Sequence, residues 1–93
     1  MRIYTVQDTT ASFYLPPFTA QTDDQAKRMF IGSLGDSFAF RTDFSLFYIG
    51  DFNDELGEIT KPSHILVLRG SSISEMLDPR PRPLQQNAKE LTQ

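Results

Sequence analysis

Apolar side chains alternate through residues 44–52, a period of two that is typical of a β-strand. One side of this strand is expected to carry Phe44, Leu46, Tyr48, Gly50 and Phe52. The other side is expected to carry Ser45, Phe47, Ile49 and Asp51. Because both sides are largely apolar, we expect the strand either to be covered on both sides or to present one side to a partner. Residues 53–57, ending in Gly57, are predicted to form a hairpin turn before a returning strand at residues 58–60.

Three further segments have the composition of β-strands. Residues 2–7 are rich in β-branched and aromatic types, and residues 11–15 follow them after a turn, so these two segments are predicted to pair antiparallel. Pro16 and Pro17 end the second of these strands because they donate no backbone hydrogen bond. The last predicted strand spans residues 64–69.

Residues 23–34 follow the spacing of an amphipathic helix. Thr22 and Gln25 have the form of a capping box at its start, and Gly35 is suited to end it. The predicted core-facing stripe consists of Ala26, Met29, Phe30, Ser33 and Leu34. The sequence therefore predicts one helix between the two pairs of strands.

These elements predict an α+β fold with a four- to five-stranded, mainly antiparallel sheet and one helix, at about residues 23–34, packed on it. The predicted order is β-β-α-β-β, with residues 36–43 irregular. Residues 1–70 are expected to form a single domain. Residues 71–93 are expected to be a tail that is flexible or becomes ordered on a partner, with an extended proline-rich stretch at residues 79–83.

Composition and charge narrow the classes of function. The net charge is −3, and residues 1–70 carry nine acidic against six basic side chains, which argues against strong binding to phosphate backbones. The absence of cysteine excludes disulfides and thiolate chemistry and fits a reducing cytoplasm. No apolar run approaches the ~20 residues of a membrane helix, and the N-terminus lacks the apolar stretch of a signal peptide. We therefore expect a cytoplasmic protein without a membrane partner.

Residue types with catalytic or metal-binding chemistry do not gather into a recognisable motif. The acidic turn after Asp51 begins like an EF-hand loop, but Leu56 stands at the sixth position instead of glycine, and Pro62 stands at the twelfth instead of glutamate. His64 is the only histidine, and without cysteine it cannot complete a zinc site of the usual kind. We therefore expect no catalytic residue, no metal and no cofactor, and a protein that is not an enzyme.

Aromatic and basic residues lie near one another along the predicted strands, a pattern typical of surfaces that bind single-stranded nucleic acid. The candidate nucleic-acid-binding residues are Arg2, Tyr4, Arg28, Arg41, Phe47 and Arg69. The alternative is that most of these rings form the core of a domain with eight phenylalanines and no tryptophan. Phe47 and Ile49, on the second side of the strand at residues 44–52, are the candidate interface residues.

Several short motifs give the chain a family resemblance over about residues 3–60. They read Ile3-Tyr4-Thr5-Val6-x-Asp8, Ala11-x-Phe13, Pro17-Phe18, Asp24-x-Ala26-x-Arg28-x-Phe30, Asp43-Phe44-x-Leu46 and Tyr48-Ile49-Gly50-x-Phe52-x-Asp54-Glu55-x-Gly57-Glu58-Ile59. The chain resembles the small non-structural protein of gokushoviruses, which are microviruses: tailless bacteriophages with circular single-stranded DNA. Asn53 and Leu56 depart from the family pattern, in which an acid and a threonine are usual, but both lie in the turn.

The resemblance implies an accessory protein made in the bacterial cytoplasm of the host, with a role in viral DNA replication or in the switch to single-strand synthesis and packaging. It implies no catalytic or binding residue. Two hypotheses follow. In the first, the chain binds single-stranded DNA, as a homo-oligomer. The alternative is a non-enzymatic protein–protein module that associates with itself and with phage or host replication or assembly proteins, without direct DNA binding. The family resemblance favours the first hypothesis, whereas the acidic charge and the two-sided apolar strand fit the alternative better.

Overall fold

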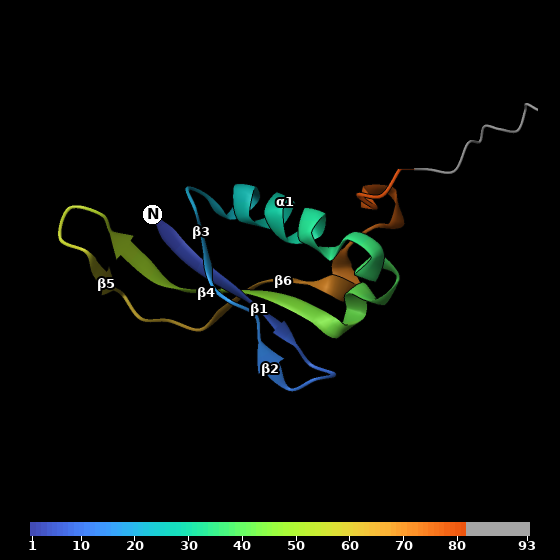
Figure 1. Cartoon of the computed structure of the whole chain (residues 1–93), viewed down its shortest axis with the longest axis horizontal. Coiled ribbons are helices and arrows are strands. Elements are labelled where there is room, and N and C mark those ends of the chain that lie inside the picture. Colours follow the sequence, from blue (N-terminus) through green and yellow to red (C-terminus); the bar gives the residue numbers. More distant parts are fainter. Residues whose placement is uncertain (82–93) are drawn as a thin grey trace, which may run out of the picture.

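The predicted α+β fold class is confirmed: one α-helix packs on one face of an antiparallel sheet (Figure 1). The computed structural model describes residues 1–81. The strands are β1 (Arg2–Asp8), β2 (Phe13–Tyr14), β3 (Phe18–Ala20), β4 (Phe44–Asn53), β5 (Glu58–Thr60) and β6 (Ile65–Arg69). The helix is α1 (Asp23–Leu34), and three 3-10 helices are η1 (Gly35–Asp43), η2 (Gly70–Ser72) and η3 (Glu75–Leu77).

The sheet is four strands wide, although it contains six strands. The long strands β1 and β4 pair antiparallel in its centre, and each outer position is shared by two short strands. β2 and β3 both pair with β1, and Pro16 and Pro17 separate them. β5 and β6 both pair with β4, separated by a segment that contains Pro62. The short strand β3 was not predicted from the sequence, because three residues after a proline pair show no alternation to detect.

A β-bulge at Ile49 and Gly50 reverses the alternation of β4. Tyr48 pairs with Tyr4, but the next residue of β1, Ile3, pairs with Gly50, so Ile49 is an extra residue on β4. The prediction placed Asp51 on the side opposite Tyr48. This is wrong, because the extra residue brings both onto one face, where the Tyr48 hydroxyl donates to Asp51 Oδ1 at 2.7 Å.

The helix has the predicted bounds because its capping signals form as expected. The Thr22 hydroxyl accepts a hydrogen bond from the Gln25 amide at 3.1 Å, and Gly35 ends the helix with φ 49°. Ala26, Phe30 and Leu34 are buried against the sheet, whereas Met29, which was placed in the same stripe, is 43% exposed.

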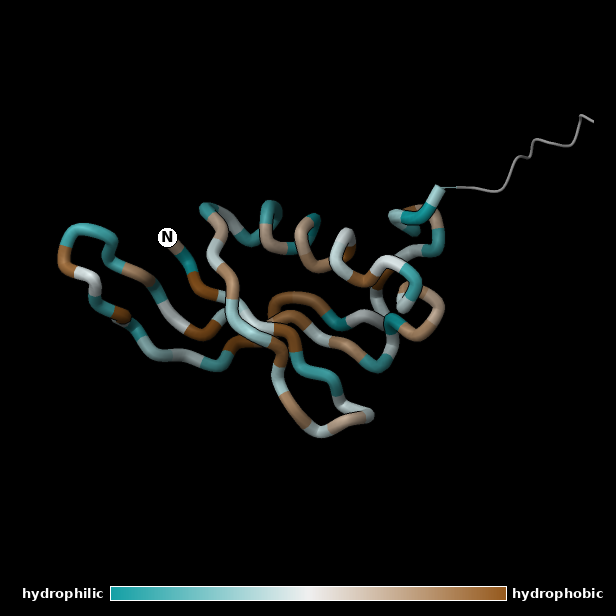
Figure 2. The backbone as a smooth tube through the Cα atoms, viewed as in Figure 1, coloured by the Kyte–Doolittle hydropathy of each residue, from teal (hydrophilic) through white to brown (hydrophobic). Residues whose placement is uncertain are grey.

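The core lies between α1 and the sheet face that carries Tyr4 and Leu46, both of which are 0% exposed. In Figure 2 the hydrophobic colours gather where the strands cross beneath the helix, and the β4–β5 turn is mostly hydrophilic. Residues 36–43, predicted to be irregular, belong to η1, which places Phe38 in the core. Ile73 is also buried in the core, so packing continues past residue 70, and residues 82–93 of the predicted tail lie outside the described part of the chain.

Candidate interaction surface

The sheet face opposite α1, here called the open face, is not covered by α1 or η1, both of which pack into the core on the other side. Strand registers identify its side chains, because residues directly opposite each other on paired strands point to the same face. Its central row contains Thr5, Phe47 and Leu66. The neighbouring row contains Tyr14, Gln7, Ser45 and Arg69. The exposed part of the central row is thus apolar, and the neighbouring row is polar apart from Tyr14.

Three ring side chains from different parts of the sheet meet on the open face and form what we call the aromatic cluster: Tyr14, Phe47 and His64. The His64 ring stacks on Phe47, with centroids 4.3 Å apart and planes 15° from parallel. Tyr14 meets both rings edge to face, and its hydroxyl lies 3.0 Å from His64 Nε2. The cluster joins β2, β4 and the segment before β6, so it spans the full width of the sheet.

A shallow hollow of about 410 Å³ lies beside the aromatic cluster. It is lined by Thr5, Tyr14, Leu15, Pro17, Ile49 and His64. The Thr5 hydroxyl donates to the Leu15 carbonyl at 2.8 Å, so the polar group of this buried residue is already satisfied within the chain. The hollow therefore presents mainly apolar and aromatic surface, with the Tyr14 and His64 ring edges as its polar groups.

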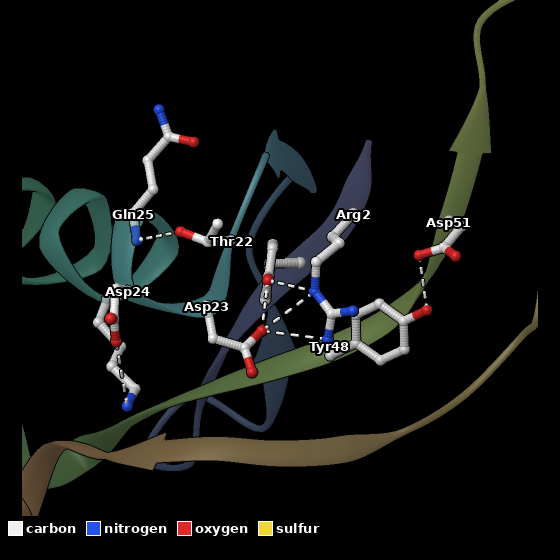
Figure 3. Close-up of polar contacts among 9 residues, drawn as sticks. Arg2, Thr22, Asp23, Asp24, Gln25, Tyr48 and Asp51 are labelled. Atoms are coloured by element: carbon white, nitrogen blue, oxygen red, sulfur yellow. Dashed lines mark hydrogen bonds and ion pairs between the residues drawn. The ribbon is translucent and has the colours of Figure 1, made fainter.

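A second polar arrangement, the Arg2 network, lies on the helix side of the sheet (Figure 3). The Arg2 guanidinium binds the Asp23 carboxylate at 3.1 Å and donates to the Tyr4 hydroxyl at 2.8 Å, and that hydroxyl donates to Asp23 Oδ1 at 2.5 Å. The guanidinium also lies 4.2 Å from the centre of the Tyr48 ring, whose hydroxyl donates to Asp51. The network ties the first turn of α1 to β1 and β4.

The protonation equilibria in the Arg2 network follow from these contacts. The hydrogen bond from Tyr4, together with the charge of Arg2, lowers the pKa of Asp23 below its ordinary value. Burial, together with the hydrogen bond to Asp23, raises the pKa of Tyr4. The hydrogen bond from Tyr48 lowers the pKa of Asp51. The carboxylates are thus held charged and the phenols neutral, which is the pattern of a structural network rather than of an acid–base pair.

The six predicted nucleic-acid-binding residues do not lie on one face. Phe47 and Arg69 are both on the open face, in adjacent rows. Arg2 and Tyr4 belong to the Arg2 network, and the Tyr4 ring is too deeply buried to stack on a base. The remaining two arginines are apart from these groups: Arg28 is exposed on α1, and Arg41 donates to the carbonyls of Phe38 and Ile73.

The two predicted interface residues do lie close to the same region. Phe47 belongs to the aromatic cluster, and Ile49 lines the hollow beside it. Sequence reasoning missed His64 as a member of this surface. His64 was predicted as the first residue of the last strand, but β6 begins at Ile65, and nothing in the sequence shows that His64 stacks on a ring seventeen positions earlier.

Between residues 1 and 81, no three side chains of His, Cys, Asp or Glu converge as metal ligands would. In that range, too, no helix combines the length and apolar composition that crossing a membrane requires.

Comparison with known proteins gives one result. No curated protein and no solved structure matches the chain significantly. The family model described as Phage ORF5 protein matches residues 1–73, which is most of the chain and includes every strand, α1 and the aromatic cluster. The chain therefore belongs to the Phage ORF5 protein family and is a bacteriophage protein.

Proposed function

We propose that this phage protein is a non-enzymatic accessory protein that acts through protein–protein contacts made by the open face. The observation that carries the proposal is the aromatic cluster of Tyr14, Phe47 and His64, which lies on a sheet face that no helix within residues 1–81 covers. Aromatic side chains are enriched in protein interfaces because each ring buries a large area at a small cost in conformational entropy.

The charges of the described residues favour a protein partner over a nucleic acid. Arg2 is already paired with Asp23, and Arg41 is used to hold Phe38 and Ile73 in place. Nucleic-acid affinity depends on several unpaired cations along one surface, and the open face has Arg69 in its polar row. Four of the six predicted nucleic-acid-binding residues do not lie on the open face with Phe47, so they could not bind the same stretch of nucleic acid there.

The finer assignment continues the resemblance to the gokushovirus non-structural protein. We propose that the chain acts in the cytoplasm of the infected bacterium, during viral DNA replication or the switch to single-strand synthesis and packaging. Its partners in this proposal are other copies of the chain and replication or assembly proteins of the phage or the host. Membership of the Phage ORF5 family supports the phage context.

A photo-crosslinking experiment in infected cells tests the protein-contact proposal. Phe47 is replaced by p-benzoyl-phenylalanine, a photoreactive residue of similar shape, and Phe40 is replaced in the same way as a control. Phe40 is the control because it is a phenylalanine, 65% exposed, on η1, which packs on the core side of the sheet through Phe38. We expect protein adducts from position 47 and few from position 40. Equal adducts from the two positions, or none from position 47, would refute the proposal.

Single-stranded DNA is a second candidate partner, favoured by one observation: Arg69 lies in the row next to Phe47, so a cation and an aromatic ring share a face. Fluorescence anisotropy with a labelled oligonucleotide at ~50 mM salt tests it, because phosphate contacts are strongest at low ionic strength. One cation on the face predicts a salt slope of only about −0.7. Binding that is unaffected by Phe47→Ser and Arg69→Gln would exclude this surface.

A further inference from the structure

We infer that the occupant of the open face is a second copy of this chain, packed face to face about a two-fold axis. This inference rests on the proposed function and specifies the protein that contacts the open face. It starts from the charge distribution of residues 1–81, in which the registered rows of the open face carry one charged side chain, Arg69. Strongly acidic or basic partners find little complementary charge there, whereas an apolar, nearly neutral face matches a copy of itself.

The order of the rows fits a self-complementary contact. Phe47 and Leu66 of the central row form the apolar centre, together with Tyr14 and His64 of the aromatic cluster, whereas Thr5 of the same row is buried beneath them. Gln7, Ser45 and Arg69, the polar members of the neighbouring row, lie to one side of this centre and would form its rim. Interfaces commonly have this arrangement of an aromatic centre and a polar rim.

The size of the open face is sufficient for a weak dimer. Four strand positions at a spacing of roughly 4.8 Å give a width near 19 Å, and the seven residues of β1 at about 3.3 Å each give a length near 23 Å. Two such faces amount to about 900 Å² of flat area, and side chains that protrude bury more than their flat projection. This area lies below the lower limit of about 1,200 Å² for stable specific interfaces, so only a weak, reversible dimer of micromolar or weaker affinity is expected.

Sedimentation velocity of the full chain, from about 5 to about 500 µM, tests the inference across the affinity range expected for such an interface. The monomer mass is 10.6 kDa, and we expect a concentration-dependent shift toward twice that value. Phe47→Ser should raise the dimer dissociation constant roughly tenfold or more, because Phe47 lies at the centre of the contact. Phe40→Ser removes an equally apolar ring from another surface and should leave the constant within about twofold of wild type.

Substitutions at two adjacent residues of β6 distinguish face-to-face packing from other forms of association. Leu66 pairs with Phe47 and points to the open face, whereas Ile65 pairs with Tyr48 and points to the other face. Ile65 is the more exposed of the two, at 56% against 38%. Face-to-face packing predicts weaker dimers for Leu66→Ser and unchanged dimers for Ile65→Ser. Circular dichroism of each variant establishes that it is folded before its mass is interpreted.

Several results would overturn the inference. A monomer at the highest concentration would do so, as would a dimer that Phe47→Ser and Leu66→Ser leave intact or that Ile65→Ser weakens equally. The crosslinking experiment separates this failure from failure of the proposed function. Adducts of twice 10.6 kDa from position 47 support the second copy, whereas heavier adducts from a chain that stays monomeric retain the protein-contact function with a different partner. If position 47 gives no adduct with a second copy or with any other protein, both the inference and the proposed function are refuted.

Discussion

Replacing Tyr4 by phenylalanine removes one hydroxyl group from the centre of the Arg2 network and leaves the buried ring in place. That hydroxyl donates to Asp23 at 2.5 Å and accepts from Arg2 at 2.8 Å, so its loss breaks two hydrogen bonds to charged partners. The ring itself, 0% exposed, keeps its packing against Phe18 and Tyr48. The substitution therefore isolates the polar contribution of a residue that also belongs to the core.

The magnitude follows from the exposure of the charged partners. A hydrogen bond to a charged group contributes about 1.5–3 kcal/mol when the pair is buried. The side chains of Arg2 and Asp23 are 38% and 46% exposed, so water replaces part of what is lost and reduces the cost. We expect Tyr4→Phe to lower the free energy of unfolding by about 1–2 kcal/mol. In a domain of this size, that loss lowers the melting temperature by roughly 5–10 °C.

Urea unfolding followed by far-UV circular dichroism measures this loss, and the chain has no tryptophan to serve as a fluorescent reporter. Tyr14→Phe is the matched control, because it removes an exposed hydroxyl that contacts His64 and should cost less than about 0.5 kcal/mol. An unchanged m-value would show that only stability has changed. If the two variants lose equal stability, the Arg2 network does not support the fold as argued.

The loss of stability in Tyr4→Phe should depend on pH in a defined way. The pKa of Asp23 is lowered in the folded state, chiefly by the hydrogen bond from Tyr4, so the stabilisation is present above the unfolded value of about 3.9 and is lost as the pH falls through the folded value. Tyr4→Phe removes the main cause. The difference in stability between wild type and variant should therefore narrow between about pH 5 and pH 2. A difference that stays constant over this interval would contradict the assignment.

Three further predictions concern the core, the bulge and the helix cap, each measured by urea or thermal unfolding. Ile73→Ala should lower the free energy of unfolding by about 2–4 kcal/mol because Ile73 is buried in the core. Met76 is 81% exposed, so Met76→Ala should change this free energy little. Gly50→Ala should lower the free energy of unfolding by about 1–3 kcal/mol, because φ is 155° and the new Cβ would lie 3.0 Å from the Thr60 carbonyl oxygen. Gly32→Ala should instead raise the free energy of unfolding by up to about 1 kcal/mol, because a Cβ on this helical residue meets open space. Thr22→Ala should cost about 1 kcal/mol by removing the bond to the Gln25 amide. A loss for Ile73→Ala no larger than that of Met76→Ala would place the end of the packed domain before residue 73.

Local signals account for the parts of the fold that could be predicted. Thr22, Gln25 and Gly35 are neighbours of the helix they delimit, so the bounds of α1 follow from capping chemistry alone. The alternation of β4 likewise predicts a strand with two apolar sides. The bulge at Ile49 and Gly50 was not predictable, because an alternating sequence reads the same with or without one extra residue in the pairing.

The candidate surface could be predicted only in part, because some of its side chains meet partners from distant segments of the chain. Phe47 and Ile49 follow from the apolar second side of one strand. His64 joins them only after β6 pairs with β4, and Arg2 is removed from the candidate cations only by Asp23, twenty-one positions away. A single sequence shows which side chains are aromatic or charged, but partners that neutralise or stack on them come from distant segments.

The proline breaks in the outer strands have a consequence for solubility. β2 has two residues, β3 and β5 have three each, and β6 has five, with Pro16, Pro17 and Pro62 between them. Neither border of the sheet offers a long, continuous row of unpaired backbone groups, which is what propagates fibres. Contact through a sheet face about a two-fold axis ends at two copies, whereas pairing along both borders of a sheet can continue from copy to copy. The interrupted borders thus allow a phage protein to keep aromatic rings on its surface with a reduced tendency to polymerise.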